Sequence, residues 1–128
     1  MKSNVFTKEI LVPASAIDEL GHVNNLIYMN WCLEAAESHW LSATNEDIRN
    51  EYVWVVLEHS ISYKNPSFEG EHLVIETWID SFKGVRSERK YRIIRPSDQK
   101  TIIEAKSLWC LLNAKTHRPT IITEDLAS

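Results

Sequence analysis

The sequence predicts an α+β fold in which a five-stranded antiparallel sheet curls around one long, buried helix. The segment from Asn24 to about Ser42 has helical periodicity, and only a narrow polar stripe interrupts its apolar surface. A helix that is apolar over most of its circumference must be covered by other elements. One strand-like segment precedes this helix and four follow it, an order typical of an antiparallel meander packed on a single helix.

The strand-like segments alternate apolar and polar residues and are separated by turns that contain Gly or Pro. They are expected at residues 5–12, 53–64, 72–80, 89–94 and 101–112. A loop over residues 13–23 leads into the helix, and a polar connection over residues 44–51 leads out of it. Asn24 or Asn25 has the short polar side chain that helix N-caps favour.

The faces of two predicted strands indicate how the sheet is covered. In the strand at 53–64, strict alternation places one set of side chains on a single face, namely Val53, Val55, Leu57, His59, Ile61 and Tyr63. The strand at 101–112 is apolar on both faces, as expected if one face packs on the helix and the other on an interface. Exposed apolar faces and strand edges favour oligomerisation, so we expect a homodimer or a tetramer.

Length and composition limit the class of protein. The 128 residues fit one domain over 1–128, and the net charge of −4 argues against nucleic-acid partners and anionic membranes. No apolar run approaches the roughly 20 residues of a membrane span, and the N-terminus lacks a signal-peptide core, so the protein is expected in the cytoplasm. Cys32 and Cys110, without a CxxC motif, predict two buried free thiols and no metal site.

The residues with catalytic potential are concentrated in AIDELGHVNNLIYMNW, residues 16–31. Asp18 lies in a loop three residues before Gly21 and about six before the helix begins. The backbone N–H groups of Val23, Asn24 and Asn25 are expected to be exposed at the positive end of the helix, where an oxyanion can bind. A carboxylate beside such a helix start is the minimum needed for attack on a carbonyl group, because one group can attack or activate water while the other stabilises the oxyanion.

By spacing alone, each of these residues also has a purely structural interpretation. Asp18 can be a solvated loop residue or a cap, and His22 can be a loop histidine bonded to backbone. Asn24 and Asn25 can simply be capping residues. The spacing does not decide between the structural and the catalytic interpretations.

The pattern D-x-x-G-H-V-N-N-x-x-Y-x-x-W over residues 18–31 resembles the signature of hot-dog-fold acyl-CoA thioesterases of the 4-hydroxybenzoyl-CoA thioesterase superfamily. The similarity continues through residues 54–71, 84–93 and 105–122, and so covers residues 5–125. The resemblance implies the hot-dog fold and hydrolysis of an acyl-CoA thioester to a free carboxylic acid and CoA. It implies no metal and no bound cofactor.

The resemblance also implies a catalytic set of Asp18, His22 and Asn25. Asp18 matches the catalytic carboxylate, and the backbone N–H of Asn25 matches the donor that polarises the thioester carbonyl. Some members carry a second acidic residue where this sequence has Ala16, so a mechanism that needs two carboxylates is disfavoured. In related enzymes the site lies between subunits, so Asp18 is expected to face strand residues of a neighbouring chain.

Substrate contacts are expected from Asn24, Tyr28, His59, Arg86 and Ser87. Tyr28 falls where family members pack the helix near the acyl pocket, and His59 matches a position that is often His. Arg86 and Ser87 stand at the entrance to a strand, where relatives bring substrate close, although a solvated strand edge is an equal interpretation. The basic segment 83–92 suits either a phosphate-rich carrier or an exposed charged strand.

Three other functions are compatible with the resemblance. The first is an acyl-carrier-protein (ACP) thioesterase, although members of that group usually carry two such domains in one chain. The second is a hot-dog dehydratase or isomerase with a His-containing acid–base pair. The third is a non-catalytic acyl-binding module, because a fold does not fix a function.

Overall fold

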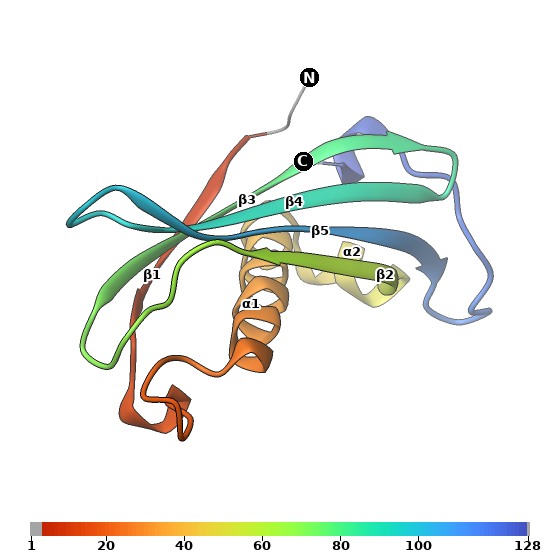
Figure 1. Cartoon of the computed structure of the whole chain (residues 1–128). Coiled ribbons are helices and arrows are strands. Elements are labelled where there is room, and N and C mark those ends of the chain that lie inside the picture. The colour runs from red at the N-terminus through yellow and green to blue at the C-terminus, as the bar shows by residue number, and fades with distance from the viewer. Residues whose placement is uncertain (1–3, 128) are drawn as a thin grey trace.

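The computed structural model describes residues 4–127, which form one curved sheet with a helix across its inner face (Figure 1). The strands are β1 Phe6–Leu11, β2 Tyr52–Tyr63, β3 His72–Lys83, β4 Arg86–Arg95 and β5 Lys100–Asn113. The helices are α1 Asn25–Ala43 and α2 Glu46–Glu51, with short 3-10 turns at Ala14–Ala16 and Glu124–Leu126. The strand order is β1-β3-β4-β5-β2, and every neighbouring pair is antiparallel, which confirms the predicted α+β fold.

Helix α1 packs on the sheet through a stripe of small and aromatic side chains. Its buried residues are Tyr28, Cys32, Ala35, Ala36 and His39. They meet the inner face of β3, β4 and β5, where Ile75, Tyr91, Ile93 and Ile103 are almost completely buried. The helix begins at the predicted cap, because Asn24 Oδ1 accepts a hydrogen bond from the N–H of Leu26 at 2.9 Å.

One chain covers α1 on one side only. Leu26 is 72% exposed and Leu41 is 49% exposed, although both belong to the apolar surface of the helix. The same holds for the free edge strand β2, where Val55 and Leu57 remain open to solvent. A single chain therefore leaves apolar surface on α1 and on the adjoining sheet edge.

The predicted face of β2 is wrong in its first half, because the strand contains a β-bulge. Its register against β5 shifts between Val56 and Glu58. One extra residue reverses the face of everything before it. Trp54 and Val56 therefore share the inner face with His59, whereas Val53 and Val55 point to the other side.

Two predicted connections also differ from the structure. The segment 44–51 contains the short helix α2, capped by Asn45, whose Oδ1 accepts from the N–H of Ile48 at 2.9 Å. An Asn followed by two acidic residues is a typical helix start, so the signal was present in the sequence. β3 and β4 extend to Lys83 and Arg86 because Gly84, with φ of 62°, closes a two-residue hairpin turn.

Tyr28→Phe should destabilise the fold. The Tyr28 hydroxyl lies 2.6 Å from Ser67 Oγ, and both side chains are buried, so this contact joins α1 to the β2–β3 connection. Removing the hydroxyl leaves Ser67 without this partner, and the free energy of unfolding should fall by about 1–3 kcal/mol in urea titrations. Tyr63→Phe is the matched control, because the Tyr63 hydroxyl is exposed and its contact with the Asn25 carbonyl is 3.4 Å long. Equal stability of Tyr28→Phe and wild type would contradict this reading.

Candidate active site

The loop before α1 holds Asp18 with one carboxylate oxygen fixed and the other free. The Asp18 N–H donates to the His22 carbonyl at 3.1 Å, and Gly21, with φ of 85°, donates back to the Asp18 carbonyl at 3.0 Å. Asp18 Oδ1 accepts from the N–H of Leu20 at 2.9 Å. Within residues 4–127, Oδ2 accepts no hydrogen bond. The carboxylate is thus oriented locally and keeps an oxygen available for chemistry.

At the start of α1, one backbone N–H remains unpaired. The N–H groups of Val23 and Asn24 donate to the carbonyls of Ser67 and Ala16, each at 2.9 Å, so the expectation that both are exposed is wrong. In the described part of the chain, the N–H of Asn25 has no acceptor. This amide lies at the positive end of a 19-residue helix, where the backbone dipoles favour a developing negative charge.

A small cleft of about 220 Å³ opens beside this helix start. The Tyr63 hydroxyl donates to the Asn25 carbonyl at 3.4 Å and forms one wall. His22 stands at the rim with its Nδ1 3.4 Å from the Val23 carbonyl and its ring edge-on to Phe68. Predicted site residues His22, Asn25 and Tyr28 all line this cleft, whereas the structure gives Asn24 the role of helix cap.

His59 lies on the inner face of β2, as predicted, but away from the helix start of its own chain. Four residues of strand separate it from Tyr63, which corresponds to roughly 13 Å. Its Nδ1 is 2.5 Å from Ser107 Oγ. Its Nε2 is sealed from solvent and is the one such side-chain atom without a hydrogen-bond partner among residues 4–127. Burial lowers the pKa of His59, so its neutral form is favoured.

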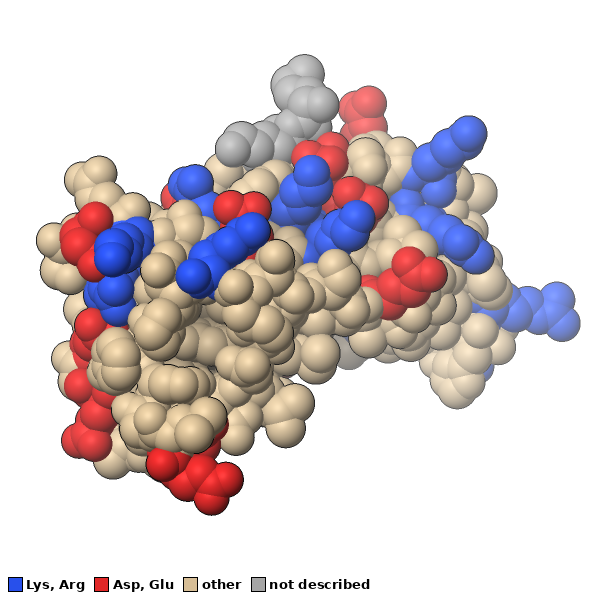
Figure 2. Space-filling view, in the orientation of Figure 1, with Lys and Arg blue, Asp and Glu red and all other residues tan. Residues whose placement is uncertain are grey.

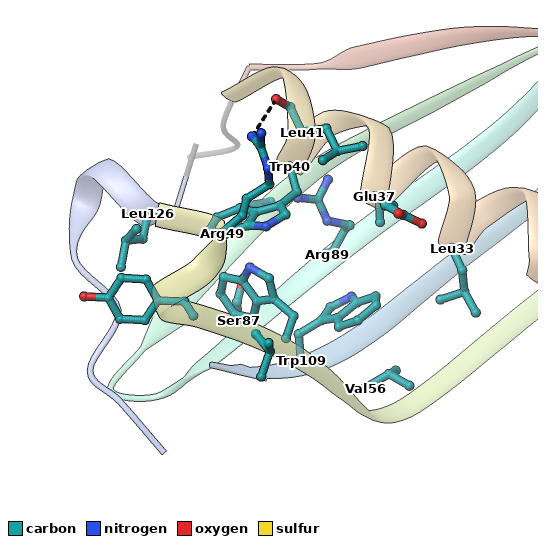
Figure 3. Close-up of a pocket in the computed structure, with 15 residues that line it drawn as sticks. Leu33, Glu37, Trp40, Leu41, Arg49, Val56, Ser87, Arg89, Trp109 and Leu126 are labelled. Carbon is teal, nitrogen blue, oxygen red and sulfur yellow. Dashed lines mark hydrogen bonds between the residues drawn. The ribbon is translucent and has the colours of Figure 1, made fainter. Parts of the chain in front are cut away.

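A larger cavity of about 450 Å³ lies between the second half of α1, α2 and the inner face of the sheet (Figure 3). Aromatic and aliphatic side chains form most of its walls, among them Leu33, Trp40, Trp54, Val56 and Trp109. Ser87 is buried and lines this cavity, but Arg86 is exposed and does not. The two neighbours point to opposite faces of β4, as successive strand residues must.

Arg89 also lines this cavity and was not singled out from the sequence as a site residue. It is 7% exposed, and its Nη1 donates to His39 Nδ1 at 2.9 Å and to Thr77 Oγ1 at 3.2 Å. Burial and the Arg89 charge lower the pKa of His39 from 6.5 to about 4. The sequence signal for Arg89 is the alternation of Ser87, Arg89, Tyr91 and Ile93, which all face inward on β4. The predicted strand began at Arg89, three residues after the actual start of β4, and so did not include the first part of this alternation.

Two of the five basic residues in segment 83–92 pair with acidic neighbours on the outer face of the sheet. Arg92 pairs with Glu76 at 2.8 Å and Lys90 pairs with Asp80 at 3.4 Å. Figure 2 shows Lys and Arg interspersed with Asp and Glu over the upper part of the face in view, while the centre below carries few charges. Such local pairing favours the exposed-strand interpretation of this segment over a carrier-binding patch.

The remaining chemistry of the described residues is limited. In residues 4–127, no three metal-ligating side chains are grouped closely enough to hold an ion. Cys32 and Cys110 are both free and buried, and burial raises the pKa of the Cys32 thiol to about 12. Within the same residues, no helix has the length and apolar character needed to cross a bilayer.

The fold is that of hot-dog thioesterases. The 1,4-dihydroxy-2-naphthoyl-CoA thioesterase Slr0204 from Synechocystis superposes with a TM-score of 0.81 at 20% identity, over 95% of this chain and 92% of that one. The Staphylococcus aureus protein SAV2348, solved in complex with CoA, gives a TM-score of 0.87 at 17% identity, over 98% and 81%. At this level of identity the superpositions establish the fold alone.

Sequence comparison defines the family. The model of the acyl-ACP thioesterase N-terminal domain matches residues 3–128, so the chain belongs to this family of thioester hydrolases. It is 29% identical over 112 residues to the candidate acyl-CoA thioesterase YneP of Bacillus subtilis (84% of this chain, 80% of the relative). It is 28% identical over 123 residues to the chloroplastic acyl-acyl carrier protein thioesterase ATL2 of Arabidopsis thaliana (94% and 65%). The chain thus spans about two thirds of the plant relative.

His39 should make the fold less stable in mild acid. Its pKa is about 4 in the folded chain and about 6.5 when unfolded, so between these values the unfolded chain binds more protons. The His39 contribution is therefore complete above pH 6.5 and is lost as the pH falls towards 4. His39→Gln keeps an acceptor for Arg89 and should flatten the pH dependence of the free energy of unfolding in that window.

His117→Asn, in an exposed turn, is the matched control and should leave the pH dependence unchanged. Denaturant titrations at half-unit pH steps measure the effect. An identical slope for His39→Gln and wild type would show that His39 titrates normally.

Proposed function

We propose that this thioester hydrolase acts on acyl-CoA, releasing a free carboxylic acid and CoA, with Asp18 as the reacting carboxylate. The observation that carries the proposal is the free Asp18 Oδ2 in the loop that ends at the unpaired N–H of Asn25. The name of the B. subtilis relative and the CoA bound to the S. aureus neighbour support the choice of CoA. We further propose one domain over residues 1–128 and a cytoplasmic location.

The chemistry follows from the weakness of the thioester bond. A thioester carbonyl is electrophilic and its thiolate leaves readily, so no Ser–His relay is required. Asp18 attacks the carbonyl carbon or removes a proton from an attacking water, and the N–H of Asn25 stabilises the oxygen that becomes negative. We assign His22 a contact with the substrate near this oxygen, because it lines the cleft beside Asn25. Ala16 offers no second carboxylate.

Hydrolysis of acyl-ACP is the second candidate substrate class. The matching family model and the Arabidopsis relative favour it. The paired charges on β3 and β4 do not favour it, because an acidic carrier protein needs a free basic surface. Parallel assays of the same acyl group on CoA and on ACP, with released thiol as the readout, separate the two.

We infer that the working unit is a homodimer or a dimer of dimers, formed across the free edge of β2. Leu26 of α1 and Val55 and Leu57 of β2 are the apolar residues that a second copy would cover. His59, whose Nε2 is buried without a hydrogen-bond partner among residues 4–127, belongs to this edge strand. A partner chain across β2 would bring a second helix start towards the strand residues that one chain leaves separate from its own.

Asp18→Asn should reduce turnover at least about a hundredfold while leaving substrate affinity nearly unchanged. The amide keeps the size of the side chain and its bond to Leu20 but lacks both nucleophilicity and basicity. The measurement is thiol release from a panel of acyl-CoA esters under saturating conditions. Glu19→Gln, an exposed acid in the same loop, is the matched control and should retain wild-type turnover. More than half of wild-type activity in Asp18→Asn would refute the assignment.

A single turnover in heavy-oxygen water separates the two roles of Asp18. As a nucleophile, Asp18 forms a mixed anhydride, and water attack on its aspartyl carbon leaves an oxygen of Asp18 in the first product acid. As a general base, Asp18 activates water, and the label enters the first product directly.

Sedimentation at micromolar concentration should show a dimer or larger species, not the 14.8 kDa chain alone. Val55→Lys places a charge on the free edge strand and should shift the equilibrium towards monomer, with loss of activity. Thr7→Lys makes the same change on β1, the opposite edge of the sheet, and should leave assembly intact. A fully active monomer would contradict the inter-subunit site.

A further inference from the structure

The large cavity contains a buried cation without a counter-ion. Arg89 gives one nitrogen, Nη1, to His39 and Thr77. In the described part of the chain, its Nε and Nη2 have no acceptor and no carboxylate lies close enough for an ion pair. Both nitrogens remain accessible to solvent, because among residues 4–127 only His59 Nε2 is both buried and without a hydrogen-bond partner. The guanidinium therefore keeps donors open to the cavity that it lines.

Both partners of Arg89 are neutral. Thr77 carries no charge, and His39, with a pKa of about 4, is unprotonated at physiological pH. An arginine does not lose its proton in proteins, so the positive charge persists although the residue is only 7% exposed. Burying a charge without an opposite charge is costly, and such groups are retained where something binds them.

The rest of the cavity suits an alkyl chain. Trp40, Trp54 and Trp109 supply apolar walls, and a volume of about 450 Å³ lies in the range of small-molecule sites. Two other charged residues line it. Arg49 is bonded to the Thr44 carbonyl, and Glu37 is exposed and forms no ion pair within residues 4–127. Neither neutralises Arg89, so the apolar space ends on an open positive charge.

The distance from the reacting carbonyl indicates which part of a substrate would reach Arg89. His39, its partner, lies 14 residues after Asn25 on α1, which is roughly 21 Å at 1.5 Å per residue. A thioester bound at the helix start of the same chain would thus be separated from Arg89 by about the length of a long acyl chain.

We propose that the preferred acyl group carries a carboxylate at the end far from the thioester, and that Arg89 binds this carboxylate. This specificity rests on the proposed thioesterase function and deepens it. A terminal hydroxyl would accept a hydrogen bond from Nη2 but would leave the charge unbalanced. A carboxylate provides both a hydrogen-bond acceptor and a negative charge, in the bidentate geometry that guanidinium groups favour.

Matched substrates test the proposal. Dicarboxylic monothioesters of CoA with eight, twelve and sixteen carbons are compared with the unsubstituted acyl-CoA of equal length, and with the ω-hydroxyacyl-CoA as neutral polar control. Wild type should show a kcat/KM at least about tenfold higher for the carboxylated member of the best pair. Arg89→Gln should abolish this preference while retaining activity on the unsubstituted chain. Equal or better hydrolysis of the unsubstituted or ω-hydroxy chains by wild type overturns the proposal.

Two further variants exclude trivial explanations. Arg89→Lys keeps the positive charge but lacks the paired N–H donors of the guanidinium, so it should retain part of the preference. This result would show that the loss in Arg89→Gln comes from the missing charge and not from misfolding. Glu37→Gln removes the acidic side chain of the wall and should leave the preference intact. A uniform loss on all substrates in Arg89→Gln, together with a lowered melting temperature, would indicate a structural role and overturn the proposal.

A binding measurement separates this proposal from the thioesterase function itself. The three cavity tryptophans report binding through their intrinsic fluorescence, and decanoate and decanol are probes of equal length. Decanoate should bind wild type at least about tenfold more tightly, and Arg89→Gln should bind both alike. Absence of all acyl-CoA hydrolysis would sink the thioesterase function but not this result. Equal affinities in wild type would sink the proposal even if hydrolysis is found.

Discussion

The contact between α1 and the inner face of the sheet is the constraint on which the other features depend. Cys32, Ala35 and Ala36 are small, so the helix approaches β3 and β4 closely at its middle. Tyr28 and Trp40 lie on either side of this close contact, one near each end of the helix. The helix is thereby fixed at its centre, and its two ends face different surroundings.

The first end keeps one unpaired backbone N–H, and the residues just before it are hydrogen-bonded from two directions. The N–H of Val23 donates to the carbonyl of Ser67, in the connection before β3. The N–H of Asn24 donates to the carbonyl of Ala16, in the loop before α1. These bonds orient the first turn and leave the amide of Asn25 unused. At the second end Trp40 packs on the cluster of Ile79 and Leu111 and meets Trp54 edge-on, with ring centroids 5.8 Å apart. Both tryptophans line the large cavity.

Most of the fold was predictable because periodicity and turn residues are local signals. The loop carrying Asp18, the cap at Asn24 and all five strands could be placed in this way, and the thioesterase family followed from the motif at 18–31. The β2 bulge could not be predicted, because Val53, Val55 and Leu57 continue the alternation with no Gly or Pro to mark the shift. The environment of Arg89 could not be predicted either, since its partners His39 and Thr77 come from other elements.

The β2 bulge also determines which side chains of this strand line the large cavity. The extra residue turns Trp54 and Val56 inward, across from Leu111 and Trp109. In an unbroken strand, Val53 and Val55 would occupy the inner face and Trp54 would point to the outside. The tryptophan wall would be lost, and two smaller valines would pack against the sheet below α2. A single extra residue in β2 thus decides which side chains line the large cavity.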